Sequence, residues 1–163
     1  RQGVLEEVDL VDILASISDF STLNGRMEYI GNVQGHDWYN DTTATAPDAA
    51  EASLKSFSEK VVLIAGGSDK GSPVESLGQE IVNSVSHVVL MPGAGTDKLL
   101  QFFGDNNFDK LTQVKTMQEA VETALEKAEP GQPIIMSPGF ASFSTFAHEF
   151  ERGDACVNIV KSL

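Results

Sequence analysis

The sequence predicts an α/β fold built on an open, mostly parallel β-sheet with helices on both of its faces. Short apolar segments alternate along the chain with longer segments whose apolar residues recur at helical spacing. Two of the short segments, Val61–Ile64 and Val88–Leu90, are continuously apolar, which is typical of strands buried on both faces of a parallel sheet. Strand–helix alternation of this kind favours right-handed crossovers and therefore a Rossmann-like arrangement.

Six segments are expected to form strands. The first two are separated by Gln34-Gly35, which can form a tight turn between antiparallel neighbours. The expected strands are Arg26–Val33, Asp37–Asn40, Val61–Ala65, His87–Met91, Gln113–Val114 and Ile134–Met136.

Helices are expected where apolar residues recur three or four positions apart. The expected helices are Pro47–Phe57, Val74–Val85, Thr96–Phe103, Met117–Ala128 and Ser142–Arg152. One more helical pattern, Leu5–Phe20, precedes every strand. We therefore expect residues 1–22 to be the last helix and linker of a preceding domain, and residues 23–163 to form the α/β domain.

Composition narrows the classes of function. The chain has 163 residues and a net charge of −13, which argues against nucleic acid or an anionic membrane as partner. No run of 18 or more apolar residues is present, so no membrane span is expected. The acidic start lacks a signal peptide and an initiator Met, which suggests a fragment. The single cysteine, Cys156, excludes an intrachain disulfide and fits a reducing cytoplasm.

Ligands of open α/β sheets bind beyond the carboxyl ends of the strands, so the segments that follow the expected strands are candidate sites. After the second strand, Thr45 is placed to cap a helix. It is either only a cap or part of an anion site, in which the free N–H groups of that helix attract the anion. Asp41 in the same segment either caps a loop or holds a ligand hydroxyl.

Two further segments that follow expected strands are also candidate sites. Gly66-Gly67-Ser68-Asp69-Lys70-Gly71 is not a phosphate-binding P-loop, because G-x-x-x-x-G-K-[ST] is absent. Lys70 is either a solvated lysine or an anion contact. In Ser137-Pro138-Gly139-Phe140-Ala141-Ser142-Phe143, Ser142 is expected to cap the last helix. The three histidines show no metal-ligand spacing, and no metal site is expected.

Taken in order, these segments resemble the C-terminal domain of the Mur ligases. The matching motifs are Asn-Asp-Thr-Thr-Ala-Thr, Gly-Gly-Ser-Asp-Lys-Gly, Ser-Pro-Gly-Phe-Ala-Ser-Phe and Phe-Glu-Arg-Gly, and the resemblance covers about Leu10 to Leu163. It is nearest to the ligases that join D-glutamate to UDP-N-acetylmuramoyl-L-alanine in cytoplasmic peptidoglycan synthesis. Such enzymes use ATP and Mg²⁺ to form an acyl phosphate, which the amino acid's amine attacks.

The resemblance also implies roles for individual residues. Thr45, Lys70 and Ser142 match residues that hold the carboxylates of D-glutamate, and Arg26 and Asp41 match residues that contact ATP. The P-loop, the Mg²⁺ ligands and the nucleotide-sugar site belong to the family's central and N-terminal domains. Residues 1–22 would then end the ATP-binding central domain, and the fragment alone would carry no catalytic residues and be inactive.

Two positions depart from the family pattern. Thr43 stands where the family has a lysine that helps to organise the amino-acid site, and the family's substrate-side aromatic falls on Glu149, one position before Phe150. We expect Phe150 and Thr43 to contact the amino acid. Two alternatives stay open: the C-terminal domain of another Mur or folylpolyglutamate-type ligase, and a non-enzymatic module that binds an anion or a partner protein.

Overall fold

A computed structural model describes residues 23–143 and 145–163. The expected first helix and the proposed domain boundary at residue 22 lie outside these residues. Within the described part of the chain, no helix is both long and apolar enough to cross a membrane.

The sheet has six strands in the order β1-β2-β6-β3-β4-β5. Among the strands of the described residues, β1 pairs with β2 in antiparallel fashion and the remaining pairs are parallel. The strands are β1 (Glu28–Val33), β2 (His36–Asn40), β3 (Val61–Gly66), β4 (Val85–Met91), β5 (Leu111–Gln113) and β6 (Ile134–Met136). The predicted open, mostly parallel sheet is confirmed. The last strand inserts between β2 and β3, which brings the ends of these three strands together.

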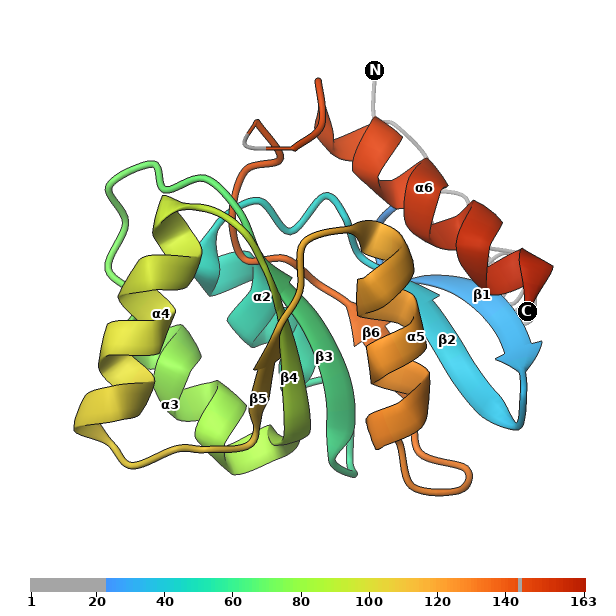
Figure 1. Cartoon of the computed structure of the whole chain (residues 1–163), viewed down its shortest axis with the longest axis horizontal. Coiled ribbons are helices and arrows are strands. Elements are labelled where there is room, and N and C mark those ends of the chain that lie inside the picture. The colour runs from blue at the N-terminus through green and yellow to red at the C-terminus, as the bar shows by residue number, and fades with distance from the viewer. Residues whose placement is uncertain (1–22, 144) are drawn as a thin grey trace, which may run out of the picture.

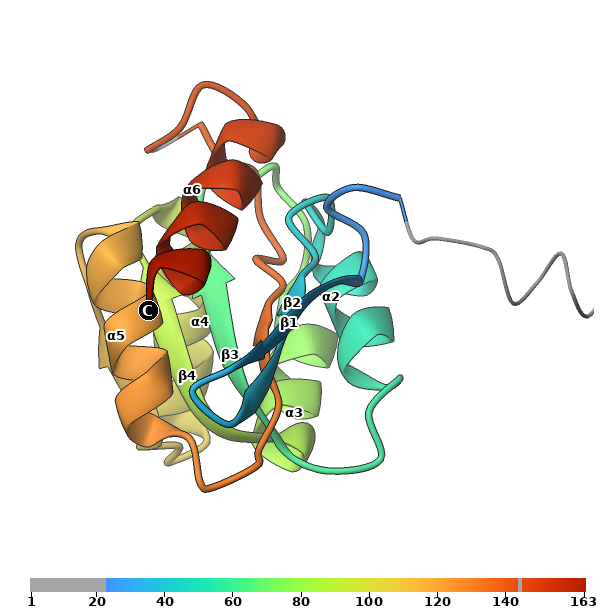
Figure 2. The same cartoon turned by 90° about the vertical axis from the view of Figure 1, so that its right-hand side faces the viewer.

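Helices cover both faces of the sheet (Figures 1 and 2). Side chains along β3 alternate between two apolar cores: Leu63 belongs to the core under α2, α3 and α4, and Ile64 to the core under α5 and α6. The helices are α2 (Pro47–Leu54), α3 (Glu75–Ser84), α4 (Ala94–Asp105), α5 (Met117–Lys127) and α6 (Glu149–Ser162). Because β3 is buried on both faces, its continuous apolar run is explained.

The last helix is the main error of the sequence prediction. The pattern predicted Ser142–Arg152, whereas α6 begins at Glu149 and continues to Ser162. Its N-cap is His148, whose side chain accepts a hydrogen bond from the Glu151 N–H, so Ser142 does not cap it. The apolar spacing of the phenylalanines after Ser142 imitates a helix, yet Phe143 lies in the preceding loop and is exposed.

Candidate functional site

Three polar loops meet at one edge of the sheet, because β2, β6 and β3 are parallel neighbours and end side by side. We call them the Asp41 loop (residues 41–46), the Ser142 loop (residues 137–143 and 145–148) and the Lys70 loop (residues 67–74). Backbone hydrogen bonds join them. The Gly139 N–H donates to Ala44 O at 2.9 Å, and Ser68 and Ala141 exchange two bonds of 2.8 and 3.2 Å.

The structure brings Lys70 and Thr45 together. Lys70 Nζ donates a hydrogen bond to Thr45 Oγ1 at 3.4 Å, and its side chain is exposed. Among the described residues, no carboxylate lies within ion-pair distance of Lys70 Nζ. The expected helix-capping role of Thr45 is wrong, because the N-cap of α2 is Ala46, which makes no side-chain cap bond. The Thr45 hydroxyl is therefore available to a partner at the edge.

Ser142 contributes a buried hydroxyl to the same edge. Its side chain is 3% exposed, and Oγ finds no hydrogen-bond partner among the described residues. Buried polar atoms without a partner are rare in folded proteins, because leaving one unpaired costs about 1–3 kcal/mol. Ser142 directly follows Ala141, whose backbone is paired with the Lys70 loop. An unpartnered donor on a loop that is paired with the loop of Lys70 suits an anionic ligand.

Close backbone approach holds these loops together. Gly67 has φ +139°, and a Cβ at this position would lie 2.3 Å from Ala141 O. Any larger residue would push the Lys70 loop away from the Ser142 loop, so the glycine is required for their pairing.

Arg26 and Asp41 line a hollow between the Asp41 loop and α2. This hollow has a volume of about 250 Å³ and is lined by Arg26, Met27, Asp41, Thr43, Ala44, Ala49, Ala52 and Ser53. Arg26 is exposed, whereas Asp41 is 2% exposed. The two residues that the sequence assigned to one ligand therefore share one depression.

The Asp41 carboxylate also holds the loops in place. Oδ2 accepts hydrogen bonds from Ser53 Oγ at 2.6 Å and from Ser137 Oγ at 2.7 Å, while Oδ1 accepts the Met27 N–H at 3.1 Å. Each carboxylate oxygen can accept about two hydrogen bonds, so Oδ1 keeps one acceptor site. Asp41 thus ties three segments together and can still accept a ligand hydroxyl.

Thr43 is fixed to the turn before β1. Its N–H and its hydroxyl both donate to Gly25 O, at 3.0 and 2.9 Å. The residue lines the hollow of Arg26 and Asp41, and its hydroxyl is bonded away from Lys70. The expected contact of Thr43 with the amino acid stays a prediction, because Thr43 lines the same hollow as Arg26.

Arg152 on α6 is buried against the loops at this edge of the sheet. The sequence interpretation did not identify Arg152 as a residue of the site. It is 3% exposed and donates to Thr42 Oγ1, Thr42 O and Phe140 O, at 3.2, 2.9 and 3.0 Å. Burial lowers the pKa of Arg152 to about 10, which leaves it charged at neutral pH. One signal could have revealed it: Arg152, Cys156 and Val160 recur every fourth position, and all three are buried.

Phe150 and Glu149 stand at the start of α6. Phe150 is 46% exposed, and its ring lies 6.3 Å from the His148 ring, measured between centroids. Glu149 is half-buried, and its carbonyl oxygen accepts a hydrogen bond from Thr42 Oγ1 at 2.6 Å. Which of the two fills the aromatic position near a ligand stays a prediction. Among the described residues, no group of three or more His, Cys, Asp or Glu could hold a metal ion.

Comparison with known proteins places this edge in a family. Residues 25–140 match the family model described as Mur ligase, glutamate ligase domain. The chain belongs to this family. The UDP-N-acetylmuramoylalanine–D-glutamate ligases of Roseiflexus sp. (strain RS-1) and Chlamydia abortus are 40% and 36% identical to it, over 92% and 94% of the chain. The chain spans 33% and 36% of those proteins, about a third of their length.

Solved structures support the fold of this Mur ligase domain. The UDP-N-acetylmuramate–alanine ligase of Thermotoga maritima aligns over 95% of the chain and 34% of its own length, with a TM-score of 0.66 and 10% identity. Folylpolyglutamate synthase of Mycobacterium tuberculosis, complexed with ADP and AMPPCP, aligns over 82% of the chain and 33% of its own length, with a TM-score of 0.59 and 15% identity. The family predicted from the sequence motifs is confirmed.

Proposed function

We propose that this chain is the amino-acid-binding domain of an ATP-dependent UDP-N-acetylmuramoyl-L-alanine:D-glutamate ligase. The proposal is carried by one observation: Lys70, Thr45 and the unpartnered hydroxyl of Ser142 come from three neighbouring loops at one edge. Two relatives with that printed name are 36–40% identical to the chain, which supports the same assignment.

The edge suits a ligand with carboxylate groups. Lys70 offers an ammonium group, and Thr45 and Ser142 offer hydroxyl donors, which together match the acceptors of a dicarboxylic amino acid. Charge adds selectivity, because Lys70 is one of eleven Lys and Arg residues in a chain of net charge −13. A ligand held there has its amine oriented, and positioning of this kind lowers a barrier by up to roughly 7–11 kcal/mol.

The hollow of Arg26 and Asp41 is proposed to receive ATP. The exposed guanidinium of Arg26 can pair with phosphate oxygens, and Oδ1 of Asp41 retains an acceptor site for a ribose hydroxyl. ATP supplies the phosphoryl group that activates the accepting carboxylate. Mg²⁺, the P-loop and the nucleotide-sugar site would come from the central and N-terminal domains of the same polypeptide, in the cytoplasm.

A second candidate is a Mur-type or folylpolyglutamate-type ligase that adds another amino acid. Thr43 favours it, because this residue brings no positive charge to the amino-acid site and its hydroxyl is bonded to Gly25 O. The two candidates differ in the amino acid that stimulates ATP hydrolysis.

The test uses the complete reading frame that encodes these residues. With UDP-N-acetylmuramoyl-L-alanine present, D-glutamate is expected to stimulate ATP hydrolysis and amide formation. Lys70→Ala should raise the KM for D-glutamate by about 10- to 100-fold, because a charged hydrogen bond contributes about 1.5–3 kcal/mol, and should leave the KM for ATP nearly unchanged.

Lys60→Ala is the matched control. Lys60 is an exposed lysine just before β3, at the opposite edge of the sheet, and its replacement should leave both KM values unchanged. Stimulation by a different amino acid would favour the second candidate. A Lys70→Ala enzyme with the original KM for D-glutamate would contradict the carboxylate role.

A further inference from the structure

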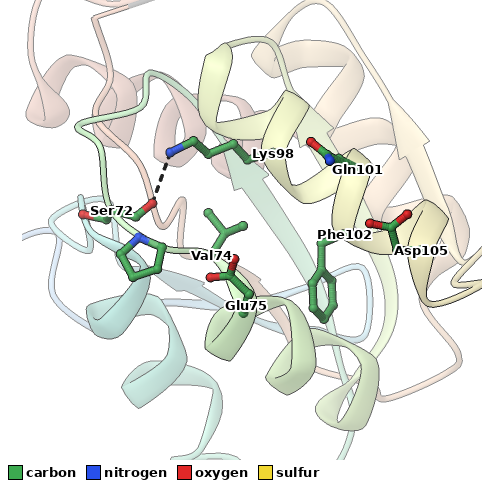
Figure 3. A pocket seen from close by; sticks show the side chains of 8 residues that line it. Ser72, Val74, Glu75, Lys98, Gln101, Phe102 and Asp105 are labelled. Carbon is green, nitrogen blue, oxygen red and sulfur yellow. Dashed lines mark hydrogen bonds between the residues drawn. The ribbon is translucent and has the colours of Figure 1, made fainter.

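Lys98 on α4 reaches across to the Lys70 loop. Its Nζ lies 2.6 Å from Asp69 Oδ2 and donates a hydrogen bond to Ser72 O at 3.3 Å. This side chain lines a hollow of about 330 Å³ between α3 and α4. Figure 3 shows Lys98 among the lining side chains, with its bond to Ser72 dashed. The lysine therefore contacts the loop on both sides of Lys70.

Asp69 and Gly71 flank Lys70 and are tied to each other. Asp69 Oδ1 accepts the Gly71 N–H at 2.9 Å, which closes a small turn around Lys70. Because Lys98 binds the other carboxylate oxygen, Asp69 has one oxygen in the turn and one on α4. The backbone that carries Lys70 is thereby fixed relative to a helix of the core.

Lys98 also offsets a charge that would oppose an anionic ligand. Asp69 is the residue next to Lys70, and without Lys98 its carboxylate would compete with a ligand carboxylate for the Lys70 ammonium group. The hydrogen bond from Lys98, followed by that from the Gly71 N–H, holds the pKa of Asp69 below its usual value, so Asp69 is charged at neutral pH.

We propose that Lys98 is a positioning residue for Lys70: it anchors the Lys70 loop to α4 and neutralises Asp69, so that Lys70 is free to bind the ligand carboxylate. The inference rests on the proposed function of Lys70. Lys98 itself stays engaged with Asp69 and Ser72 and does not touch the ligand.

The experiment uses the complete ligase chain with D-glutamate, ATP and UDP-N-acetylmuramoyl-L-alanine. Lys98→Met is expected to raise the KM for D-glutamate about tenfold, with kcat and the KM for ATP within about twofold, because Lys98 acts on a single loop. Lys98→Arg keeps the positive charge and a donor to Ser72 O, and it should keep the KM for D-glutamate within about threefold of the original.

A matched control removes another exposed ion pair. Lys127 pairs with Glu126 on α5, which packs on the other face of the sheet from α4, and Lys127→Met should leave the KM for D-glutamate unchanged. The double variant Lys98→Met with Asp69→Asn removes both charges, so it should recover a large part of the lost affinity, as a double-mutant cycle measures.

The outcomes separate the two proposals. If the unmodified enzyme shows no D-glutamate-dependent hydrolysis, the proposed function fails. If it does respond to D-glutamate, the inference about Lys98 is overturned by an unchanged KM in Lys98→Met. It is also overturned by equal rises in the KM for ATP and for D-glutamate. A double variant as impaired as Lys98→Met overturns the neutralising role of Lys98, because the double variant lacks the Asp69 charge as well as the anchor to α4.

Discussion

The Asp41 loop and the Lys70 loop lie at the same edge of the sheet but are held by different forces. The Asp41 loop is fixed by buried groups: Asp41 accepts three hydrogen bonds, and Thr42 is bonded by Arg152. The Lys70 loop is largely exposed beyond Ser68 and is tied to α4 through Lys98. The loop that carries Thr45 therefore depends on the fold, whereas the loop that carries Lys70 depends on an ion pair near the surface.

This difference has a functional consequence. Buried hydrogen bonds are screened little by salt, whereas a partly exposed ion pair weakens as ionic strength rises. Damage to the Asp41 loop should therefore appear first as lost stability. Damage to the Lys70 loop should appear as lost ligand affinity in a protein that stays folded.

The largest effect is expected from Asp41→Ala, because the change removes the acceptor of three hydrogen bonds and leaves the fully buried Ser137 hydroxyl without its partner. Urea unfolding of the chain should show a loss of about 3–5 kcal/mol in the free energy of unfolding.

The matched control for this change is Asp37→Ala. Asp37 also accepts hydrogen bonds from two side chains, those of Tyr29 and Asn32, but these bonds are exposed. Its replacement should change the free energy of unfolding by less than about 1 kcal/mol. Equal losses in the free energy of unfolding of the two variants would show that the buried hydrogen bonds of Asp41 contribute no more to stability than the exposed bonds of Asp37.

The sheet could be predicted from the sequence because strand burial leaves a local signal. Val61–Ile64 is apolar at every position, and the observed β3 is buried at every position. The loops that follow β2, β3 and β6 were also predictable as candidate sites, since each one follows a segment that the sequence predicts as a strand. The position of β6 between β2 and β3 has no local signal, because it results from long-range pairing.

The errors arose where tertiary contacts override local spacing. Phe143 and Phe150 extend a helical pattern in the sequence, yet both are exposed, and α6 begins only at Glu149. Arg152 looks like a solvated helix residue, but Gly153 beside it lets α6 approach so closely that a Cβ there would lie 2.7 Å from Thr42 Cγ2. Such close packing brings Arg152 into contact with loops far away in the sequence.

A smaller effect is expected from Thr43→Val, which keeps the shape of the side chain and removes its hydrogen bond to Gly25 O. The free energy of unfolding should fall by about 0.5–1.5 kcal/mol, the usual contribution of one neutral hydrogen bond. Thr43→Ser keeps the hydroxyl, so its free energy of unfolding should fall by less than that of Thr43→Val. If the two variants are equally stable in urea, the bond to Gly25 contributes nothing to this loop.

The smallest effect on the stability of these loops is expected from neutralising Asp69. Its pKa is lowered from the ordinary value of 3.8, first by the hydrogen bond from Lys98 and then by the Gly71 N–H. A carboxyl group with a lowered pKa in the folded state stabilises the fold fully above its ordinary pKa. The contribution is lost as pH falls through the lower, folded value. Acid should therefore loosen the Lys70 loop, and Asp69→Asn should do so at neutral pH.

Amide hydrogen exchange of the Gly71 N–H measures this loosening. The N–H should exchange faster in Asp69→Asn, because a bond to a neutral oxygen is about half as strong as one to a carboxylate. The Gly25 N–H, which donates to Glu28 Oε2 at 2.9 Å, is a bond of the same type outside the loop and should be unaffected. The Ser68 N–H should also keep its protection, because its acceptor is Ala141 O of the Ser142 loop. Faster exchange at Ser68 as well would mean that the ion pair, rather than the backbone pairing, holds the two loops together.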